Sequence, residues 1–453
     1  MKRLNNLYNN MISYSNISFV FNKIKCNCHN KRKIFEFMKD KNCNLIDILN
    51  DLKNENYTFS RYNCVLIHEK KYRIIMSETI RDKIVNHLVS YFILKPALSN
   101  LIDTNVATRE GKGTGYAYQK VEEFINSIGS DKDIYVLKID INKYFYNIDH
   151  KILFDMISKR IKDKKALNII NNIISLTDSG YINENITSLV NEEIDRVNKL
   201  NISSNEKNKK ISELKKIPLY KKGRGLSIGC LTNQLLAIFF LSDIDNYIKE
   251  ELKHRWYLRY MDDLYIFDTD KEKLKQSFKL INDKLIDKRL NINNKSGIYR
   301  LSDGINVLGY TYYTYNNKLY IKYNNSNIRK IERKLNRLYI DDFSHYYKSF
   351  NSYKGYFKRC NTNLYFDKYK LLEINTMYDK YKLVKARYSN YYVLIKYKKK
   401  YYSYEDDLKY FKKIINRKKK NNSFFEKEYL KIISIVDNVV ILDGNDIVFT
   451  GGY

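Results

Sequence analysis

Two adjacent carboxylates, Asp262 and Asp263, are the side chains of this sequence best suited to chemistry. They lie between two runs of aromatic and aliphatic residues, and such runs are typical of paired β-strands. The sequence therefore predicts that both acids lie at the tip of a hairpin. A solvated turn is the simpler explanation, because Asp is a common turn residue. Adjacent acids repel each other, however, and a bound divalent cation would offset that repulsion.

A third carboxylate, Asp140, follows the apolar run 134–139, which predicts a strand that ends at this residue. Nucleotidyl transfer needs two divalent ions roughly 4 Å apart, and Mg²⁺ prefers carboxylate and phosphate oxygens. If the strand of Asp140 lies beside the hairpin, the three carboxylates could hold two Mg²⁺ ions, for which Mn²⁺ could substitute. The backbone carbonyl of Ile141 is a natural additional ligand. We therefore expect the three aspartates to be catalytic.

The order of these motifs resembles the palm of reverse transcriptases, with Asp140, then Phe145, then the Tyr-Met-Asp-Asp hairpin at 260–263. The resemblance extends in the same order over about residues 66–370. It implies an RNA-directed DNA polymerase, which adds dNTPs to a DNA or RNA primer on an RNA template. It also implies an α+β right-hand polymerase fold of fingers, palm and thumb, here with small N- and C-terminal additions.

The same resemblance assigns roles to residues around the incoming nucleotide. Arg73, with Lys70 and Lys71, matches the fingers residues that hold the triphosphate. Phe145 matches an aromatic gate that leaves no room for a ribose 2′-hydroxyl, although a core aromatic would have the same composition. Lys295 resembles the lysine that can protonate the leaving pyrophosphate.

A glycine-rich stretch, Gly-Lys-Gly-Thr at 111–114, looks like the second fingers motif of bacterial enzymes. This resemblance makes Lys112 a candidate contact for nucleic acid. The stretch lacks the spacing of a P-loop, and taken alone it could be any turn or phosphate cradle.

Residues 225–234, Gly-Leu-Ser-Ile-Gly-Cys-Leu-Thr-Asn-Gln, are similar to the motif of diversity-generating retroelements, normally Gly-Leu-Pro-Ile-Gly-Asn-Leu-Thr-Ser-Gln. Most reverse transcriptases have Gln where this chain has Ile228, and in that family the aliphatic residue is linked to inaccurate copying of template adenines. Gly229 would let the backbone approach the nascent base pair, and Gln234 is expected at the nucleic acid. The three differences from the motif are Ser227 for Pro, Cys230 for Asn and Asn233 for Ser.

The biological role stays open between adenine-mutagenic retrohoming and antiphage defence, because related bacterial defence enzymes share these motifs. A non-catalytic nucleic-acid-binding relic is a third alternative. Such a relic would be expected to have lost at least one of the three aspartates, and the sequence keeps all of them.

Around these motifs we expect four parts. They are an N-terminal extension (1–65), fingers and palm (66–325) with a polar helical insertion (177–217), a helical thumb (326–375) and a C-terminal basic α/β appendage (376–453). Residues 392–407 of the appendage resemble a degenerate first domain of MutS mismatch-repair proteins, and a plain RNA-binding module is the alternative.

The predicted thumb begins with a helix that is apolar on one side and basic on the other. Ile328, Ile331, Leu335 and Leu338 form the apolar stripe, and Lys330, Arg333, Lys334 and Arg337 fill the other side. A solvated face is the ordinary explanation for such a pattern. Beside polymerase motifs, we expect the basic face to lie along a nucleic-acid backbone.

The composition favours a polyanionic partner. Lys and Arg total 82 against 51 acidic residues, a formal charge of +31. The longest apolar stretch, 235–241, is too short to span a bilayer, so we expect no membrane partner. Six scattered cysteines and the lack of an apolar signal segment suit a bacterial or phage-encoded protein of the cytoplasm. A structured non-coding RNA and a small accessory protein are further partners that the resemblance allows.

Overall fold

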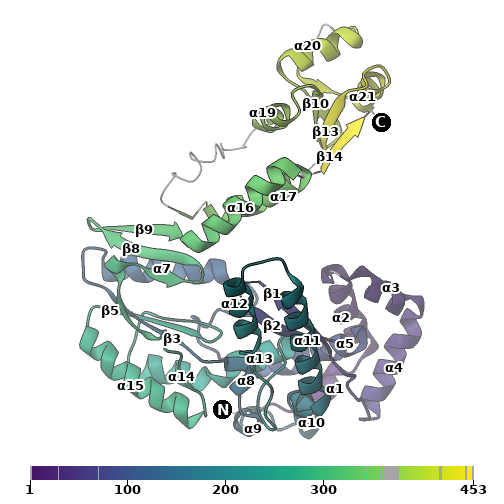
Figure 1. The fold of residues 1–453 in the computed structure, drawn as a ribbon. Coiled ribbons are helices and arrows are strands. Elements are labelled where there is room, and N and C mark those ends of the chain that lie inside the picture. The colour runs from purple at the N-terminus through teal and green to yellow at the C-terminus, as the bar shows by residue number, and fades with distance from the viewer. Residues whose placement is uncertain are drawn as a thin grey trace. The chain divides into compact units, whose positions relative to one another are not determined.

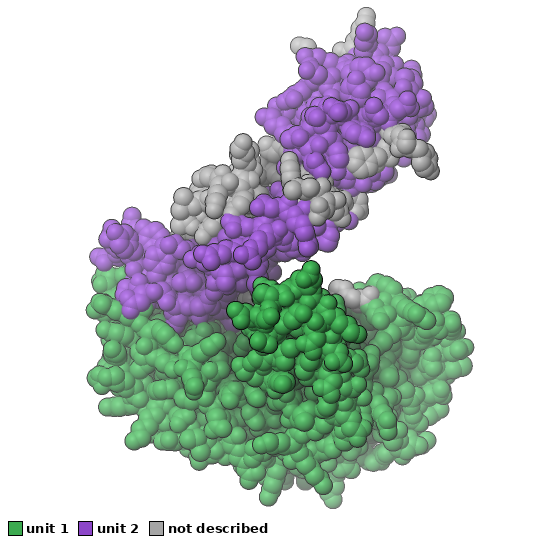
Figure 2. Space-filling model, in the orientation of Figure 1, with its two compact units in different colours: residues 1–300 green, residues 301–453 purple. Residues whose placement is uncertain are grey.

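The computed structural model describes the chain except for residues 1–2, 29, 70, 342, 358, 361–376, 418–420, 444–445 and 451–453. The chain divides into two compact units, residues 1–300 and 301–453, which Figure 2 colours separately. None of the helices in the described part of the chain is long and apolar enough to cross a membrane.

The centre of the first unit is an antiparallel four-stranded sheet (Figure 1). Its strands, in spatial order, are β4 (Tyr257–Tyr260), β5 (Asp263–Asp268), β3 (Tyr135–Asp140) and β6 (Gly297–Arg300). Both the strand that was expected to end at Asp140 and the hairpin that was expected to carry Asp262 and Asp263 are therefore confirmed. These are the elements that bring the predicted acids to one edge of the sheet.

Helices cover both faces of this sheet. Phe267 of β5 contacts Phe124 of α7 (Thr114–Ile128) at 5.9 Å between ring centroids. Its neighbour Ile266 belongs to the same apolar core as Ile281 and Leu285 of α15 (Lys271–Asp287). Because successive residues of a strand point to opposite faces, α7 and α15 lie on opposite sides of the sheet. Burial on both faces explains why these strands are apolar nearly throughout.

The N-terminal extension is helical, as expected, and shares the core of the first unit. Its helices are α1 (Leu7–Met11), α2 (Tyr14–Asn27), α3 (Lys31–Lys39) and α4 (Lys41–Lys53). Leu45, Ile48 and Leu52 of α4 are buried in one apolar cluster with Ile84 and Leu88 of the fingers. The extension therefore packs as part of the core of the first unit.

The fingers consist of a hairpin and the helices that follow it. The elements are β1 (Asn63–His68), β2 (Tyr72–Ser77), α5 (Ile80–Leu88), a π-helical turn (Val89–Leu94) and α6 (Lys95–Ala97). Strands β1 and β2 pair antiparallel, with Cys64 opposite Met76. The outcome is a two-stranded platform directly before the helix that packs on the extension.

The polar insertion is helical, as expected, and it consists of two helices, the first of which is anchored more firmly than its polar sequence indicated. The helices are α11 (Gly180–Lys199) and α12 (Ser204–Leu214). Ile182 and Ile186 are fully buried. The side-chain amide of Asn183 accepts from the backbone N–H of Tyr220 and donates to its carbonyl, each at 2.9 Å. The insertion thus braces the segment that leads into residues 225–234.

The remaining helices of the first unit connect these parts. They are α8 (Tyr144–Asn147), α9 (His150–Ser158), α10 (Lys164–Ser175), α13 (Leu231–Phe240) and α14 (Ser242–Asn246), with short turns of 3₁₀ type at Leu176–Asp178 and of π type at Tyr247–Glu251.

The second unit starts with a short turn (Leu301–Asp303) and a three-stranded antiparallel sheet, β7 (Ile305–Val307), β8 (Tyr310–Tyr315) and β9 (Lys318–Tyr323). Two helices follow, α16 (Asn325–Asp341) and α17 (Phe343–Phe357). The apolar stripe predicted on α16 is confirmed, because Ile328, Ile331 and Leu335 pack with Phe350 and Phe357 of α17. Leu338 is buried as well.

The last part of the second unit is a five-stranded mixed sheet with helices. Its elements are α19 (Met377–Arg387), β10 (Tyr392–Tyr397), β11 (Lys400–Tyr402), α20 (Glu405–Ile414), β12 (Ser423–Phe424), α21 (Glu426–Ile433), β13 (Val439–Asp443) and β14 (Asp446–Thr450). The spatial order is β12-β11-β10-β13-β14, and only β10 and β13 are parallel.

Candidate active site

The hairpin tip between β4 and β5 is held from inside the protein. Met261 and Asp262 form the turn, since Tyr260 pairs with Asp263, and Met261 has a left-handed φ of 55°. The buried guanidinium of Arg259 donates to the Met261 carbonyl at 2.8 Å. The position of Asp262 therefore depends on a cation beneath the turn.

Arg259 is itself fixed by a buried carboxylate. It donates to both oxygens of Asp245, each at 2.7 Å, and to the Ile238 carbonyl at 2.6 Å. The Tyr257 hydroxyl donates to the same carboxylate at 2.7 Å. Neither charged residue could be recognised from the sequence, because the types and spacing of Arg259 and Asp245 do not show that they lie inside the core.

Asp140 lies directly across from Asp263. The register of β3 and β5 pairs these two residues, so their side chains lie on the same face of the sheet. Side-chain carbons of directly opposed residues are roughly 5 Å apart. The structure therefore brings Asp140, Asp262 and Asp263 together at one end of the central strands β3 and β5, as the sequence predicted.

The backbone after Asp140 follows a second pairing that bears on Ile141. The Asn142 N–H donates to the Asn291 carbonyl at 2.8 Å, and the Asn293 N–H donates to the Asp140 carbonyl at 2.7 Å. These bonds flank the bridge between Ile141 and Ile292. In such a non-hydrogen-bonded pair, the N–H and C=O of Ile141 point away from the partner segment. This orientation is compatible with a carbonyl ligand on the side of β5.

The acids repel one another electrostatically. Burial, followed by the charges of Asp263 and Asp140, raises the pKa of Asp262 to about 7, and Arg73 opposes that rise. Burial also raises the pKa of Asp263 to about 6, where Lys138 opposes the rise and Asp140 adds to it. A cluster of carboxylates that resists ionisation is a site where a cation would be strongly stabilising.

The donor set fits a hard divalent cation, since it consists of carboxylates and a backbone carbonyl. Among the described residues, however, no group of three or more His, Cys, Asp or Glu side chains is arranged so that it could hold a metal ion. The residues that would hold Mg²⁺ are Asp140, Asp262, Asp263 and the Ile141 carbonyl. Their side chains, which are half-buried at the ends of β3 and β5, would have to turn toward a shared ion.

The predicted fingers hairpin supplies one cation that acts on the acids. Arg73 lies on β2, is exposed, and is close enough to lower the pKa of Asp262. Lys71 is exposed in the turn before β2, and Lys70 lies outside the described residues. The positive charge of Arg73 thus acts on Asp262, as a residue that binds a triphosphate would be expected to do.

Phe145 and Ile228 lie on neighbouring segments. Phe145, on α8, is half-buried, and its carbonyl accepts from the Leu226 N–H at 2.7 Å. Ile228 is also half-buried, and its carbonyl accepts from the Met76 N–H of β2 at 2.8 Å. Residues 226–228 therefore bridge the palm segment that follows Asp140 and the fingers strand.

Gly229 is required by this bridge itself. Its φ is 132°, and a Cβ there would lie 2.6 Å from the Met76 carbonyl oxygen. Any side chain would push the segment away from β2. Besides the expected approach of this glycine to a nascent base pair, the structure gives a second reason for glycine at the position.

The other predicted contacts lie in varied surroundings. Gln234 is half-buried on α13, with its amide oxygen 3.2 Å from the Thr108 hydroxyl. Lys112 is paired, because its ammonium lies 2.6 Å from a carboxylate oxygen of Asp103. Binding of nucleic acid by Lys112 would therefore compete with this ion pair. Lys295 is exposed in a turn, two residues after Asn293.

The predicted basic face of α16 is present on the second unit. Lys330, Arg333 and Arg337 are exposed, and Lys334 is half-buried with its ammonium 5.7 Å from the ring centroid of Tyr353. These side chains lie opposite the buried stripe, as an amphipathic helix requires.

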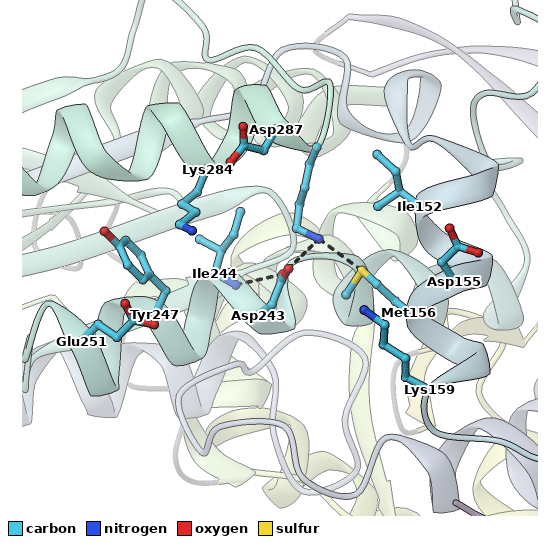
Figure 3. Close-up of a pocket in the computed structure, with 11 residues that line it drawn as sticks. Ile152, Asp155, Met156, Lys159, Asp243, Ile244, Tyr247, Glu251, Lys284 and Asp287 are labelled. Atoms are coloured by element: carbon cyan, nitrogen blue, oxygen red, sulfur yellow. Dashed lines mark hydrogen bonds and ion pairs between the residues drawn. The ribbon is translucent and has the colours of Figure 1, made fainter.

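A cavity of about 500 Å³ elsewhere in the first unit is separate from this site (Figure 3). It lies between α9, α14 and α15, and none of the predicted site residues lines it. Inside it, Lys288 pairs with Asp243 at 2.8 Å and contacts the Met156 sulfur at 3.1 Å. The cavity gives no support to an active site away from the three aspartates.

Comparison with known proteins identifies the class. A model of the reverse transcriptase (RNA-dependent DNA polymerase) family matches residues 53–312. The chain therefore belongs to the reverse transcriptase family, and the expected enzyme class, an RNA-directed DNA polymerase, is confirmed. The expected right-hand polymerase fold is confirmed with it. Members of this family act on a nucleic-acid template and primer and generally use divalent metal ions.

Among solved structures, the chain is similar to an apo telomerase from Candida tropicalis that is truncated from its C-terminal domain. The sequence identity is 13%, the TM-score is 0.40, and the likeness covers 59% of this chain. The chain spans 55% of that structure's length. No curated protein matches the sequence.

Proposed function

We propose that this chain extends a DNA or RNA primer with dNTPs on an RNA template by two-metal nucleotidyl transfer at Asp140, Asp262 and Asp263. The observation that carries the proposal is the pairing of Asp140 with Asp263 across β3 and β5, beside the turn of Asp262. When bound, two divalent ions activate the primer hydroxyl and neutralise the triphosphate. The three carboxylates and the Ile141 carbonyl hold those ions in the proposed site.

The remaining roles are those that the resemblance to reverse transcriptases implies. Arg73 binds the triphosphate as a cation beside the acids. Phe145 packs against the sugar and excludes a 2′-hydroxyl, while Ile228 and Gly229 lie under the nascent base pair. Lys295 donates a proton to the leaving pyrophosphate.

Other charged and polar groups of both units hold the template and primer. Phosphates are the natural partners of cations on a protein with a formal charge of +31. The residues in this role are Lys112, Gln234, Lys330, Arg333, Lys334 and Arg337. A structured RNA and a small accessory protein are further partners that this basic surface would suit.

The direct test is primer extension by an Asp262→Asn variant, which removes a charge with little change of shape. On an RNA template with Mg²⁺, extension should fall by two or more orders of magnitude, since the carboxylate acts only as an ion ligand. Asp287→Asn is the matched control, because Asp287 is exposed on α15 outside the acid cluster. Near-normal extension by Asp262→Asn would contradict the proposal.

For the biological role we propose adenine-mutagenic copying in a bacterial or phage-encoded retroelement, within the cytoplasm. The support is Ile228 within the segment 225–234. Sequencing of the products should show errors concentrated at template adenines, and an Ile228→Gln variant should reduce them. Errors spread evenly over the four template bases would favour the alternative, a reverse transcriptase of antiphage defence.

A further inference from the structure

The three positions at which residues 225–234 differ from the retroelement motif contact one another. The Asn233 amide donates to the Ser227 hydroxyl at 2.6 Å and to the Ser227 carbonyl at 3.3 Å. The Ser227 hydroxyl lies 3.4 Å from the Cys230 sulfur. All three side chains are buried, with exposures of 0%, 0% and 1% for Ser227, Cys230 and Asn233.

A fourth residue, Tyr62, ties this cluster to the fingers. Its hydroxyl accepts from Ser227 at 3.2 Å and from the Cys230 thiol at 3.7 Å. Burial raises the pKa of Tyr62 well above its usual range, so the phenol stays neutral. The Tyr62 N–H in turn donates to the hydroxyl of Tyr181, on the polar insertion, at 2.9 Å.

The members of this cluster depend on one another chemically. A buried hydroxyl or amide without a partner loses its solvation and gains nothing in exchange. Proline at position 227 would offer no hydroxyl to Asn233 or Tyr62. A serine there is therefore accommodated because Asn233 and Tyr62 satisfy it, and the substitutions at 227 and 233 act as one linked change.

Two members of the cluster flank, in the sequence, the two residues that are proposed to face the nucleotide. Ile228 and Gly229 lie between Ser227 and Cys230 in the chain, and Ile228 is bonded to Met76 of β2 at 2.8 Å. Strand β2 also carries Arg73. Tyr62 and Cys230 share an apolar cluster with Met76 of β2, so a shift of the buried polar groups would move Ile228 relative to Arg73.

We propose that Ser227, Asn233 and Tyr62 are positioning residues. They fix the position of Ile228 and Gly229 relative to the incoming dNTP. This inference rests on the proposed polymerase function and deepens it, because it assigns nucleotide affinity to a buried network that does not touch the substrate. Cys230 fills the remaining space and completes the contacts of the Tyr62 hydroxyl.

The first part of the test compares Ser227→Ala and Asn233→Ala with the parent in steady-state extension on an RNA template. The KM for dNTP should rise about tenfold, which corresponds to about 1.4 kcal/mol, while kcat changes by less than about threefold. Ser242→Ala is the matched control, a buried serine of α14 outside the cluster. A lower kcat with unchanged KM would mean a general structural role and would overturn the proposal.

The second part restores the motif. The triple variant Ser227→Pro, Cys230→Asn and Asn233→Ser replaces the whole linked set at once. Its KM should return to within about threefold of the parent, although Ser227→Pro alone should raise KM as strongly as Ser227→Ala. Effects of the three substitutions that simply add would overturn the linkage.

Folding and activity are separated by two further readings. If a single variant fails to fold, as judged by its thermal unfolding, the triple variant decides the outcome by its KM alone. Failure of the proposed function looks different, because the parent chain itself would then extend no primer. If the parent is active and every variant has the same KM for dNTP as the parent, the positioning role of the network is wrong and the proposed polymerase function stands.

Discussion

Arg259 and Asp245 form a fully buried ion pair, with guanidinium and carboxylate 2.7 Å apart, directly beneath the turn that carries Asp262. The same guanidinium reaches the Met261 carbonyl. One charge pair thereby links the helix α14 to the tip of the β4–β5 hairpin. We therefore expect that substitutions of this pair can restore the stability of the protein without restoring its activity.

An Arg259→Met variant should lose about 3–5 kcal/mol of unfolding free energy, because it leaves Asp245 as an uncompensated buried charge. Adding Asp245→Leu should recover most of that stability. Primer extension should stay low in the double variant, since nothing then holds the Met261 carbonyl. Denaturant unfolding and extension assays on both variants check this, and full recovery of extension would show that the turn does not need Arg259.

The raised pKa values of Asp262 and Asp263 predict how metal binding depends on pH. Both carboxyls must ionise before they bind a cation, at about pH 7 and about pH 6 in the free protein. Mg²⁺ affinity measured by calorimetry should therefore rise as the pH increases from 5 to 8. An affinity that is flat over this range would contradict the pKa shifts.

The same shifts predict the sign of a stability effect in metal-free protein. The folded state holds a proton on Asp262 up to about pH 7, whereas the ordinary value is 3.8. The folded form therefore binds more protons in this window, and the contribution of this group to stability falls as the pH rises through it. The difference in Tm between parent and Asp262→Asn should grow in favour of the variant from pH 4 to pH 7. Saturating Mg²⁺ should reduce that difference.

Phe145 should control sugar selection. Phe145→Ala removes the ring, so ribonucleotide incorporation relative to dNTP incorporation should increase by at least about tenfold. Phe145→Tyr keeps the ring and should keep the discrimination, which makes it the matched control. Unchanged sugar selection in Phe145→Ala would assign the side chain to the core, consistent with its contact to Tyr144 at 5.9 Å between ring centroids.

The basic face of α16 should act through phosphates. Arg333→Gln with Arg337→Gln should weaken duplex binding and flatten its salt dependence, by slightly less than one unit of slope for each lost contact. Sequence preference should not change, because phosphates carry no base information. Lys275→Gln with Lys279→Gln on α15 removes two exposed charges elsewhere and is the control. If the plots of duplex affinity against salt concentration are parallel for the parent and the arginine double variant, these residues do not contact phosphates and the basic face is only solvated.

Local pattern was enough to predict the elements that carry the acids. The apolar runs before Asp140 and around the hairpin specify strands, and the stripe on α16 specifies a buried helix face. The pairing of Asp140 with Asp263 could be expected only from the family resemblance, because strand order depends on contacts distant in sequence. The partners of Arg259 and Ser227 could not be predicted, since whether a polar group is buried depends on the whole core.

The segment of this chain that matches the family is shorter than the segment that forms the folded core around it. The family match runs from residue 53 to 312, yet Leu45, Ile48 and Leu52 lie in the same apolar cluster as the fingers helix. At the other border, the match stops inside β8, whose partner β9 spans Lys318–Tyr323. A fragment trimmed to the homologous segment would expose part of a core at one end and an unpaired strand edge at the other. Residues outside the segment that matches the family are therefore part of its scaffold, and a minimal active enzyme must be larger than that segment.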